Sequence, residues 1–398
     1  MVQFRKDSTK GDFPMLQLCV SQQQNDIPFA FKSTGIRVYS FEEAIYHVFH
    51  YWRESVDDFL SDPMIAWVSE LGLSYIASKM KDLAHTDNFT ARLLSFLQLV
   101  DYFSREEIAG LTSTLQAWEQ RREWEKLKER ADHLVERGEP ARALSLYKRA
   151  LGFEENVALL NNMGVVCMQL SASKEAAGYL ARAMEIEPQN LNILLHYIEA
   201  AILSRQYENA ALSLQMAESI APNNADIQFL HGLFAYEQKN YIKALAFYEK
   251  AVQLDPDVPY YIYKMADVHM AIRQFAKALE TMQTIPVKDA AYYLKEAEIH
   301  AAAADVPASL KCMRRATSAP DGTTNANLWA KLAEYYRRDY DWRRAEKAIS
   351  YALGLAPDND LVRLESARIK KGLGRTRDYQ AELSEILKSF KDRYKADR

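Results

Sequence analysis

The sequence predicts an all-α protein: an α-solenoid of stacked helical pairs, preceded by a small, mostly helical N-terminal domain with a few short strands. Three observations predict this fold. The chain has only 13 glycines and 12 prolines in 398 residues, below the usual ~7% and ~5%, which favours long helices over turn-rich sheets. Small residues recur about every 34 positions from residue 143 onwards, whereas residues 1–123 lack this period.

Small side chains carry the period. One series steps by 33, 34, 34, 34, 31 and 36 residues and comprises Ala143, Ala176, Ala210, Ala244, Ala278, Ser309 and Ala345. A second series lies seven residues later and comprises Ala150, Ala183, Ala217, Ala251, Ile285, Ala316 and Ala352. A fixed period of roughly 20–50 residues indicates stacked supersecondary units. Because helices approach closely only where side chains are small, we expect these positions at helix crossings.

The clearest unit, residues 326–359, carries a family pattern. Its key residues are Trp329, Leu332, Ala333, Tyr336, Ala345, Ile349, Ala352 and Pro357. In type and spacing they resemble the tetratricopeptide repeat, with Ala for Gly and Ile for Phe. The resemblance implies a right-handed superhelix in which the first helix of each pair lines a concave, peptide-binding face.

The period also sets the domain boundaries. Repeats are expected at 124–156, 157–190, 191–224, 225–258, 259–289, 290–325 and 326–359. We expect an N-terminal domain at 1–103, a long linking helix and seven repeats at 104–359, and C-terminal capping helices at 360–398. Two repeats depart from the pattern, because Pro286 falls in the second helix of one and the loose segment 319–325 ends the next. The superhelix should be irregular there.

The N-terminal domain has its own element signals. Short strands are expected at 15–20, 27–31 and 36–39, with a turn at 33–35, and helices at 41–52, 63–84, 88–102 and 105–137. Ser40 with Glu43, and Ser104 with Glu107, have capping-box spacing and mark two of the helix starts. The segment 36–46 resembles the start of uncharacterised bacterial tetratricopeptide proteins from signalling gene clusters.

Composition excludes several classes of function. Fifty Lys and Arg against 54 Asp and Glu leave a net charge of −4, so the whole chain has no basic excess for nucleic acid or anionic membranes. Three widely spaced cysteines, without CxxC spacing, disfavour a disulfide framework or thiolate zinc site. The N-terminus lacks the apolar core of a signal peptide, and no run of ~18 apolar residues occurs. We expect a cytoplasmic protein.

The sequence contains no convincing catalytic motif, so we expect no enzyme, cofactor or metal. His47 and His50 share one helical face, but their aromatic neighbours favour packing over metal binding. His269 and His300 stand where a repeat usually has Tyr and are expected to be structural. Buried Cys167 should be unreactive, whereas the role of Cys312 is left open.

Positions that the family turns into its groove predict a binding surface for a protein or peptide. The predicted contact residues are Asn162, His196, Glu199, Phe229, Leu233, Tyr236, Glu237, Tyr260, Tyr263, Lys264 and Asp267. The aromatic members would anchor a partner segment. The alternative is that these rings only pack across the superhelix.

A second surface is basic. From 362 to 398 there are 11 Lys or Arg against 6 Asp or Glu. Contacts to an acidic partner are expected from Lys331, Arg337, Arg338 and Arg368; the alternative is a cap charged for solubility.

The function predicted from these features is a non-catalytic adaptor or scaffold that binds a protein segment in the concave groove. One alternative is a regulator or enzyme whose activity lies in the N-terminal domain. Another is a helical-repeat RNA-binding protein. Against RNA, the predicted groove contains Glu199, Glu237 and Asp267 and lacks a continuous basic stripe.

Overall fold

The computed structural model describes residues 27–31, 36–357 except 137–139, and 359–396. The chain divides into two compact units, Met1–Arg130 and Ala131–Arg398. The first unit ends later than the expected boundary at residue 103, because Leu115 and Trp118 belong to its core. The division falls inside one helix, α7 (Glu123–Glu136).

The first unit combines a two-stranded sheet with short helices. Its strands, β1 (Phe29–Ala30) and β2 (Arg37–Val38), pair antiparallel with Phe29 opposite Val38. Its helices are α1 (Phe41–His50), α2 (Trp52–Ser55), α3 (Asp62–Glu70), α4 (Ser74–Ala84), α5 (Phe89–Leu97) and α6 (Arg105–Glu119). The strands and most helices fall where the sequence predicts them, although the strands are shorter and the segment expected to be helical at 63–84 is divided into α3 and α4. The strand expected at 15–20 and the turn at 33–35 lie outside the described residues.

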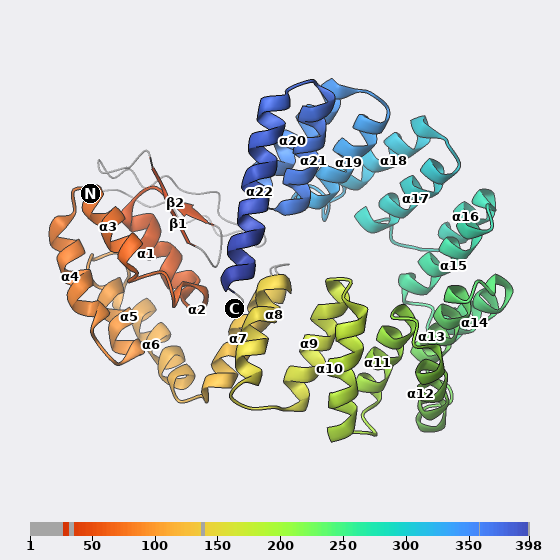
Figure 1. Ribbon diagram of the computed structural model, residues 1–398, viewed down its shortest axis with the longest axis horizontal. Coiled ribbons are helices and arrows are strands. Elements are labelled where there is room, and N and C mark those ends of the chain that lie inside the picture. Colours follow the sequence, from red (N-terminus) through yellow and green to blue (C-terminus); the bar gives the residue numbers. More distant parts are fainter. Residues whose placement is uncertain (1–26, 32–35, 137–139, 358, 397–398) are drawn as a thin grey trace. The chain divides into compact units, whose positions relative to one another are not determined.

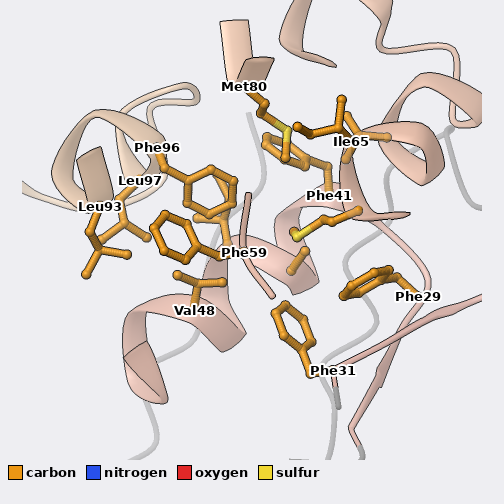
Figure 2. Packing of buried hydrophobic residues seen from close by; sticks show 14 of the residues in the cluster. Phe29, Phe31, Phe41, Val48, Phe59, Ile65, Met80, Leu93, Phe96 and Leu97 are labelled. Carbon is orange, nitrogen blue, oxygen red and sulfur yellow. The ribbon is translucent and has the colours of Figure 1, made fainter. Parts of the chain in front are cut away.

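Aromatic side chains form the core of the first unit (Figure 2). Phe59 lies edge-on to Phe96 with ring centroids 5.4 Å apart, and Phe41 lies 5.9 Å from the same ring. His47 is buried and packs on Phe31 at 4.0 Å. This placement agrees with a packed aromatic helix at 41–52.

The capping box at Ser104 is present and that at Ser40 is present only in part, because the Glu43 carboxylate accepts from the Tyr39 backbone N–H; the long helix expected at 105–137 is wrong. Ser104 and Glu107 cap α6 reciprocally, and Ser40 accepts a hydrogen bond from the Glu43 backbone N–H. Helix α6 ends at Glu119, and α7 begins at Glu123. The break has a local cause: the Arg122 backbone N–H donates to the Glu125 carboxylate (2.9 Å), which caps a new helix instead of continuing the old one.

The second unit is a series of antiparallel helical pairs. After α7 its helices are α8 (Pro140–Leu151), α9 (Val157–Gln169), α10 (Ser173–Ile186), α11 (Leu191–Leu203), α12 (Tyr207–Ile220), α13 (Ala225–Glu237), α14 (Tyr241–Leu254), α15 (Pro259–Ala271), α16 (Phe275–Met282), α17 (Ala290–Ala302), α18 (Val306–Ser318), α19 (Ala326–Arg338), α20 (Trp342–Leu355), α21 (Asp360–Gly372) and α22 (Thr376–Ala396). Figure 1 shows α11, α13, α15 and α17 on the inner side of an arc, with α12, α14, α16 and α18 outside. This confirms the predicted all-α superhelix.

The period-34 positions are the places where paired helices meet. Ala143, Ala210, Ala244 and Ala278 are fully buried. Between α13 and α14 the approach is closest at Gly232, where an added Cβ would lie 2.5 Å from the Tyr248 ring. Small side chains therefore set the separation of the helices, as the sequence predicts.

The turn inside each pair has a repeated backbone conformation. One residue of each turn has a left-handed φ of 59–63°, and these residues are Ser171, Arg205, Lys239, Arg273, Ala304 and Tyr340. Around Arg205, the N–H of Gln206 donates to the Ala201 carbonyl at 2.8 Å, as in a Schellman turn. Gly374 occupies the corresponding turn between α21 and α22, with φ 74°.

The two expected irregularities are present. Helix α16 has only eight residues and ends before Pro286. In the connection that follows α18, the Asp321 carboxylate accepts a hydrogen bond from the backbone N–H of Ala290 at 3.2 Å. Gly322 lies so close to the Ala316 carbonyl that a Cβ would be 1.9 Å from the oxygen. The connection is compact and tied to the start of α17.

Candidate functional site

The predicted groove residues lie on the first helices α9, α11, α13 and α15, which face the inner side of the arc (Figure 1). Two of them do not offer a contact surface: Phe229 and Leu233 are only 6% and 5% exposed. Phe229 packs against the rings of Tyr248, Tyr260 and Tyr261 at 5.2–5.5 Å. For these two residues the alternative prediction, packing within the superhelix, fits the structure better.

The tyrosines beside Phe229 remain accessible. Tyr260 is 47% exposed, with the Lys264 ammonium 5.3 Å from the centre of its ring. Tyr236 and Tyr263 are half-buried, and burial raises the pKa of Tyr263 to about 12. Each of these rings presents an apolar face and a hydroxyl, a combination enriched where proteins bind partners.

Charged side chains run across the same helices. Asp267 in α15 accepts from Lys295 of α17 at 3.0 Å and lies 3.6 Å from Lys264. Lys295 also pairs with Glu298 at 2.8 Å. The two lysines are thus neutralised by carboxylates of their own surface.

Glu199 in α11 has no such direct partner among the interactions of the described residues. Burial raises the pKa of its carboxyl above the usual range, and the charge of Lys264 only partly opposes this. Glu237, at the end of α13, is likewise half-buried without a hydrogen bond within the described part of the chain. A partly desolvated carboxylate without a paired cation is unfavourable. The surface therefore has uncompensated negative charge at Glu199 and Glu237.

A buried hydroxyl reaches toward this surface from the second helix α14. The Tyr248 side chain is fully buried, and its hydroxyl has no hydrogen-bond partner within the described chain. Burial raises its pKa, and the negative charges of Asp267 and Glu237 raise it further. The Tyr248 ring packs beneath the predicted contact residue Phe229, with ring centroids 5.5 Å apart.

Asn162 and His196, the two predicted contact residues nearest the N-terminus, are held by hydrogen bonds within the chain. The Asn162 amide donates to Asp132 at 3.1 Å, and Tyr147 donates to the same carboxylate. His196 Nδ1 lies 2.9 Å from the Asn161 amide oxygen, and burial lowers the pKa of His196. These side chains already have partners, so the accessible part of the surface is centred on α13 and α15.

Half of the positive charge on the predicted basic surface is compensated within the chain. Glu365 is buried and pairs with Arg337 and, at 3.2 Å, with Arg368. Glu334 pairs with Arg338 and lies 3.5 Å from Lys331. Four cations therefore share two carboxylates, which weakens the case for an acidic partner there.

An open depression of about 350 Å³ lies elsewhere, between α10, α11 and α12. It is lined by Ala181, Met184, Glu185, Tyr197, Asn209, Leu212 and Ser213. None of the predicted contact residues lines it. Among the described helices, none combines the length and apolar character needed to cross a bilayer.

One group of chemically active side chains was not expected from the sequence. Glu296 and His300 of α17 and Cys312 of α18 bring their ligand atoms within 4.8 Å of one another. The sequence analysis treated His300 as structural and left Cys312 open. The missed signal was the spacing of Glu296 and His300, which at i and i+4 share one face of a helix.

Comparisons with known proteins agree with the repeat architecture. Family models described as tetratricopeptide repeat match residues 128–190, 195–259 and 235–306. A cattle (Bos taurus) protein, BBSome complex member BBS4, is 22% identical over 143 residues. The match spans 36% of this chain and 28% of that protein, so this chain spans under a third of the relative's length.

Solved structures with the same repeat include a tetratricopeptide repeat protein from Parabacteroides merdae, 17% identical with a TM-score of 0.41 over 61% of this chain and 97% of that one. A thermophilic tetratricopeptide protein from Thermus thermophilus is 20% identical, with a TM-score of 0.37 over 49% of this chain and 97% of that one. The matched family models identify residues 128–190 and 195–306 of this chain as tetratricopeptide repeats.

Proposed function

We propose that the protein is a non-catalytic scaffold that binds a segment of another protein on the inner surface of α11, α13, α15 and α17. The tetratricopeptide repeats support a general role in protein–protein interaction. The observation that carries the proposal is the pairing of accessible tyrosines with uncompensated carboxylates on these helices. Tyr260 is exposed beside Lys264, and Glu199 lies partly buried with no direct partner among the described side chains.

The charges of this surface favour a partner segment with a basic side chain. Lys264 and Lys295 are paired within the surface, whereas Glu199 and Glu237 are not. A lysine or arginine of the partner would give the Glu199 carboxylate the cation it lacks. Its aliphatic stem would lie against a tyrosine ring, where a cation also interacts favourably with the ring face.

Selection of random peptides displayed on phage tests the proposal without a known partner. Peptides enriched on the full chain should carry Lys or Arg next to an apolar residue. Truncation of an anchoring aromatic typically costs ~1–2 kcal/mol of binding, roughly 5- to 30-fold in affinity. We expect Tyr260→Ala and Glu199→Gln each to weaken the selected peptides by that amount.

Tyr351→Ala is the matched control. Tyr351 is 48% exposed, like Tyr260, but it lies on the second helix α20 and packs against Trp329. Its truncation should leave peptide affinity unchanged. Acidic enriched peptides, or equal affinities for all three variants, would show that this surface is not the binding site.

A further inference from the structure

The hairpin of α17 and α18 holds three side chains with different ligand atoms. Glu296 and His300 lie on one face of α17, and Cys312 faces them from α18 and is only 5% exposed. Their carboxylate oxygen, imidazole nitrogen and sulfur lie within 4.8 Å of one another. The Cys312 thiol donates to the Glu296 carboxylate, with Sγ 3.2 Å from Oε2.

The same positions are apolar or aromatic in the repeat that best matches the family pattern. In 326–359 they are occupied by Leu332, Tyr336 and Ala348, which are buried. Three ligand-type side chains have thus replaced three core residues in a single hairpin. Burying polar groups is less favourable than burying apolar ones, and such a local conflict with the fold is expected where a site serves a function.

We propose that Glu296, His300 and Cys312 form a binding site for a divalent transition-metal ion, with Zn²⁺ as the best fit. Sulfur, nitrogen and oxygen ligands together suit zinc, and three protein ligands leave a fourth tetrahedral position open to water or a partner's side chain. On binding, the thiol releases its proton to solvent, and a metal–sulfur bond forms. The thiolate and the carboxylate then balance the two positive charges of the ion.

The surroundings of the cluster support this assignment. His300 Nδ1 lies 3.7 Å from the carboxylate of Asp305, the N-cap residue of α18; a carboxylate next to a metal-binding imidazole helps to orient its ring. Burial and the hydrogen bond to Glu296 raise the pKa of Cys312 to about 12, while Lys311 and Arg315 oppose the shift. Because the thiol donates a hydrogen bond to Glu296, the ion has to displace the thiol proton.

Metal titration of the full chain tests the site. After removal of metals with a chelator, the protein should bind one equivalent of Zn²⁺. Co²⁺ should give the visible bands of a tetrahedral site and a near-ultraviolet thiolate charge-transfer band. Cys312→Ala and His300→Tyr should abolish stoichiometric binding, and both place at these sites the residue types of the 326–359 repeat. Asp305→Asn keeps the helix cap and should weaken binding by about 10- to 100-fold.

Cys167→Ala and His269→Tyr are matched controls. Cys167 is the other buried cysteine of the described chain, and His269 occupies the position of His300 in the preceding repeat. Both variants should bind zinc like the parent chain. The site is refuted if the parent chain binds no zinc, or if Cys312→Ala retains the cobalt–thiolate band. Since the peptide test depends on Tyr260 and Glu199 and on none of these residues, loss of metal binding leaves it unaffected.

Discussion

The close approach of α13 and α14 at Gly232 predicts a destabilising glycine-to-alanine substitution in a helix. Alanine normally stabilises a helix interior by ~1 kcal/mol relative to glycine. At Gly232 the new methyl would lie 2.5 Å from two carbons of the Tyr248 ring. That ring is fully buried with Phe229 packed beside it at 5.5 Å, so it cannot swing into solvent. Overpacking of this kind typically costs ~1–3 kcal/mol.

Gly178 supplies the matched control, because it lies within helix α10 and an added Cβ would meet nothing within 4 Å. Gly178→Ala should raise the urea midpoint through helix propensity alone. The free energy of unfolding of Gly232→Ala should be about 1–3 kcal/mol lower than that of Gly178→Ala, and this difference is the cost of the overlap. Urea unfolding of the full chain followed by circular dichroism measures both variants in one background.

A double-mutant cycle assigns the effect to the ring. Tyr248→Leu removes the ring carbons that the new methyl would contact, so Gly232→Ala should cost less in the Tyr248→Leu background than in the parent chain. Equal stabilisation by Gly232→Ala and Gly178→Ala would refute the reasoning, because it would mean that α13 and α14 do not approach as closely as Gly232 indicates.

The remaining predictions concern charge, packing, domain independence and turns. Because burial raises the pKa of Glu199 in the folded chain, the stability of the fold falls as pH rises from the unfolded pKa of this carboxyl through the folded one. Glu199→Gln should therefore stabilise the protein at pH 7. Thermal melts should show this gain vanishing below about pH 4. Ala244→Leu and Ala278→Leu, at fully buried helix crossings, should each cost ~1–3 kcal/mol in urea unfolding, and an unchanged midpoint for both would contradict the repeat phase. A fragment of residues 123–398 should keep its helical circular-dichroism signal, because repeats contact chiefly their neighbours; loss of that signal would show one shared core. Lys239→Gly should raise the thermal midpoint slightly, since a left-handed residue with a side chain is strained by ~1–2 kcal/mol and glycine is not; a lower midpoint would argue against that turn.

The repeat architecture could be predicted because it depends on side-chain volume at fixed spacing. Ala143, Ala210 and Ala345 are buried at helix crossings as expected, and the helix starts at Ser40 and Ser104 could be predicted because a side-chain cap depends only on residues three apart. The continuous helix at 105–137 was mispredicted because propensity alone does not show that Glu125 caps the Arg122 N–H.

Site residues were harder to predict, because exposure depends on the neighbouring repeat. Phe229 stands at a position that the family turns into the groove, yet the rings of Tyr248 and Tyr261 cover it. The Glu296, His300 and Cys312 cluster spans two helices, and Glu296 and Cys312 are sixteen residues apart in sequence. Linear spacing within one helix reveals only the first two of these residues.

The loops of the array fall into two classes: the left-handed turns inside helical pairs have a constant length, and the connections between pairs vary in length. From α9 to α20 every turn inside a pair has three residues, such as 204–206 and 272–274. Connections between pairs vary: 221–224 and 255–258 have four residues, whereas 283–289 and 319–325 have seven. The differences in loop length between the repeats of this chain therefore lie at the joints between hairpins. Lengthening a joint can redirect the next hairpin and reshape the curvature of the inner surface while the packing inside each hairpin is kept.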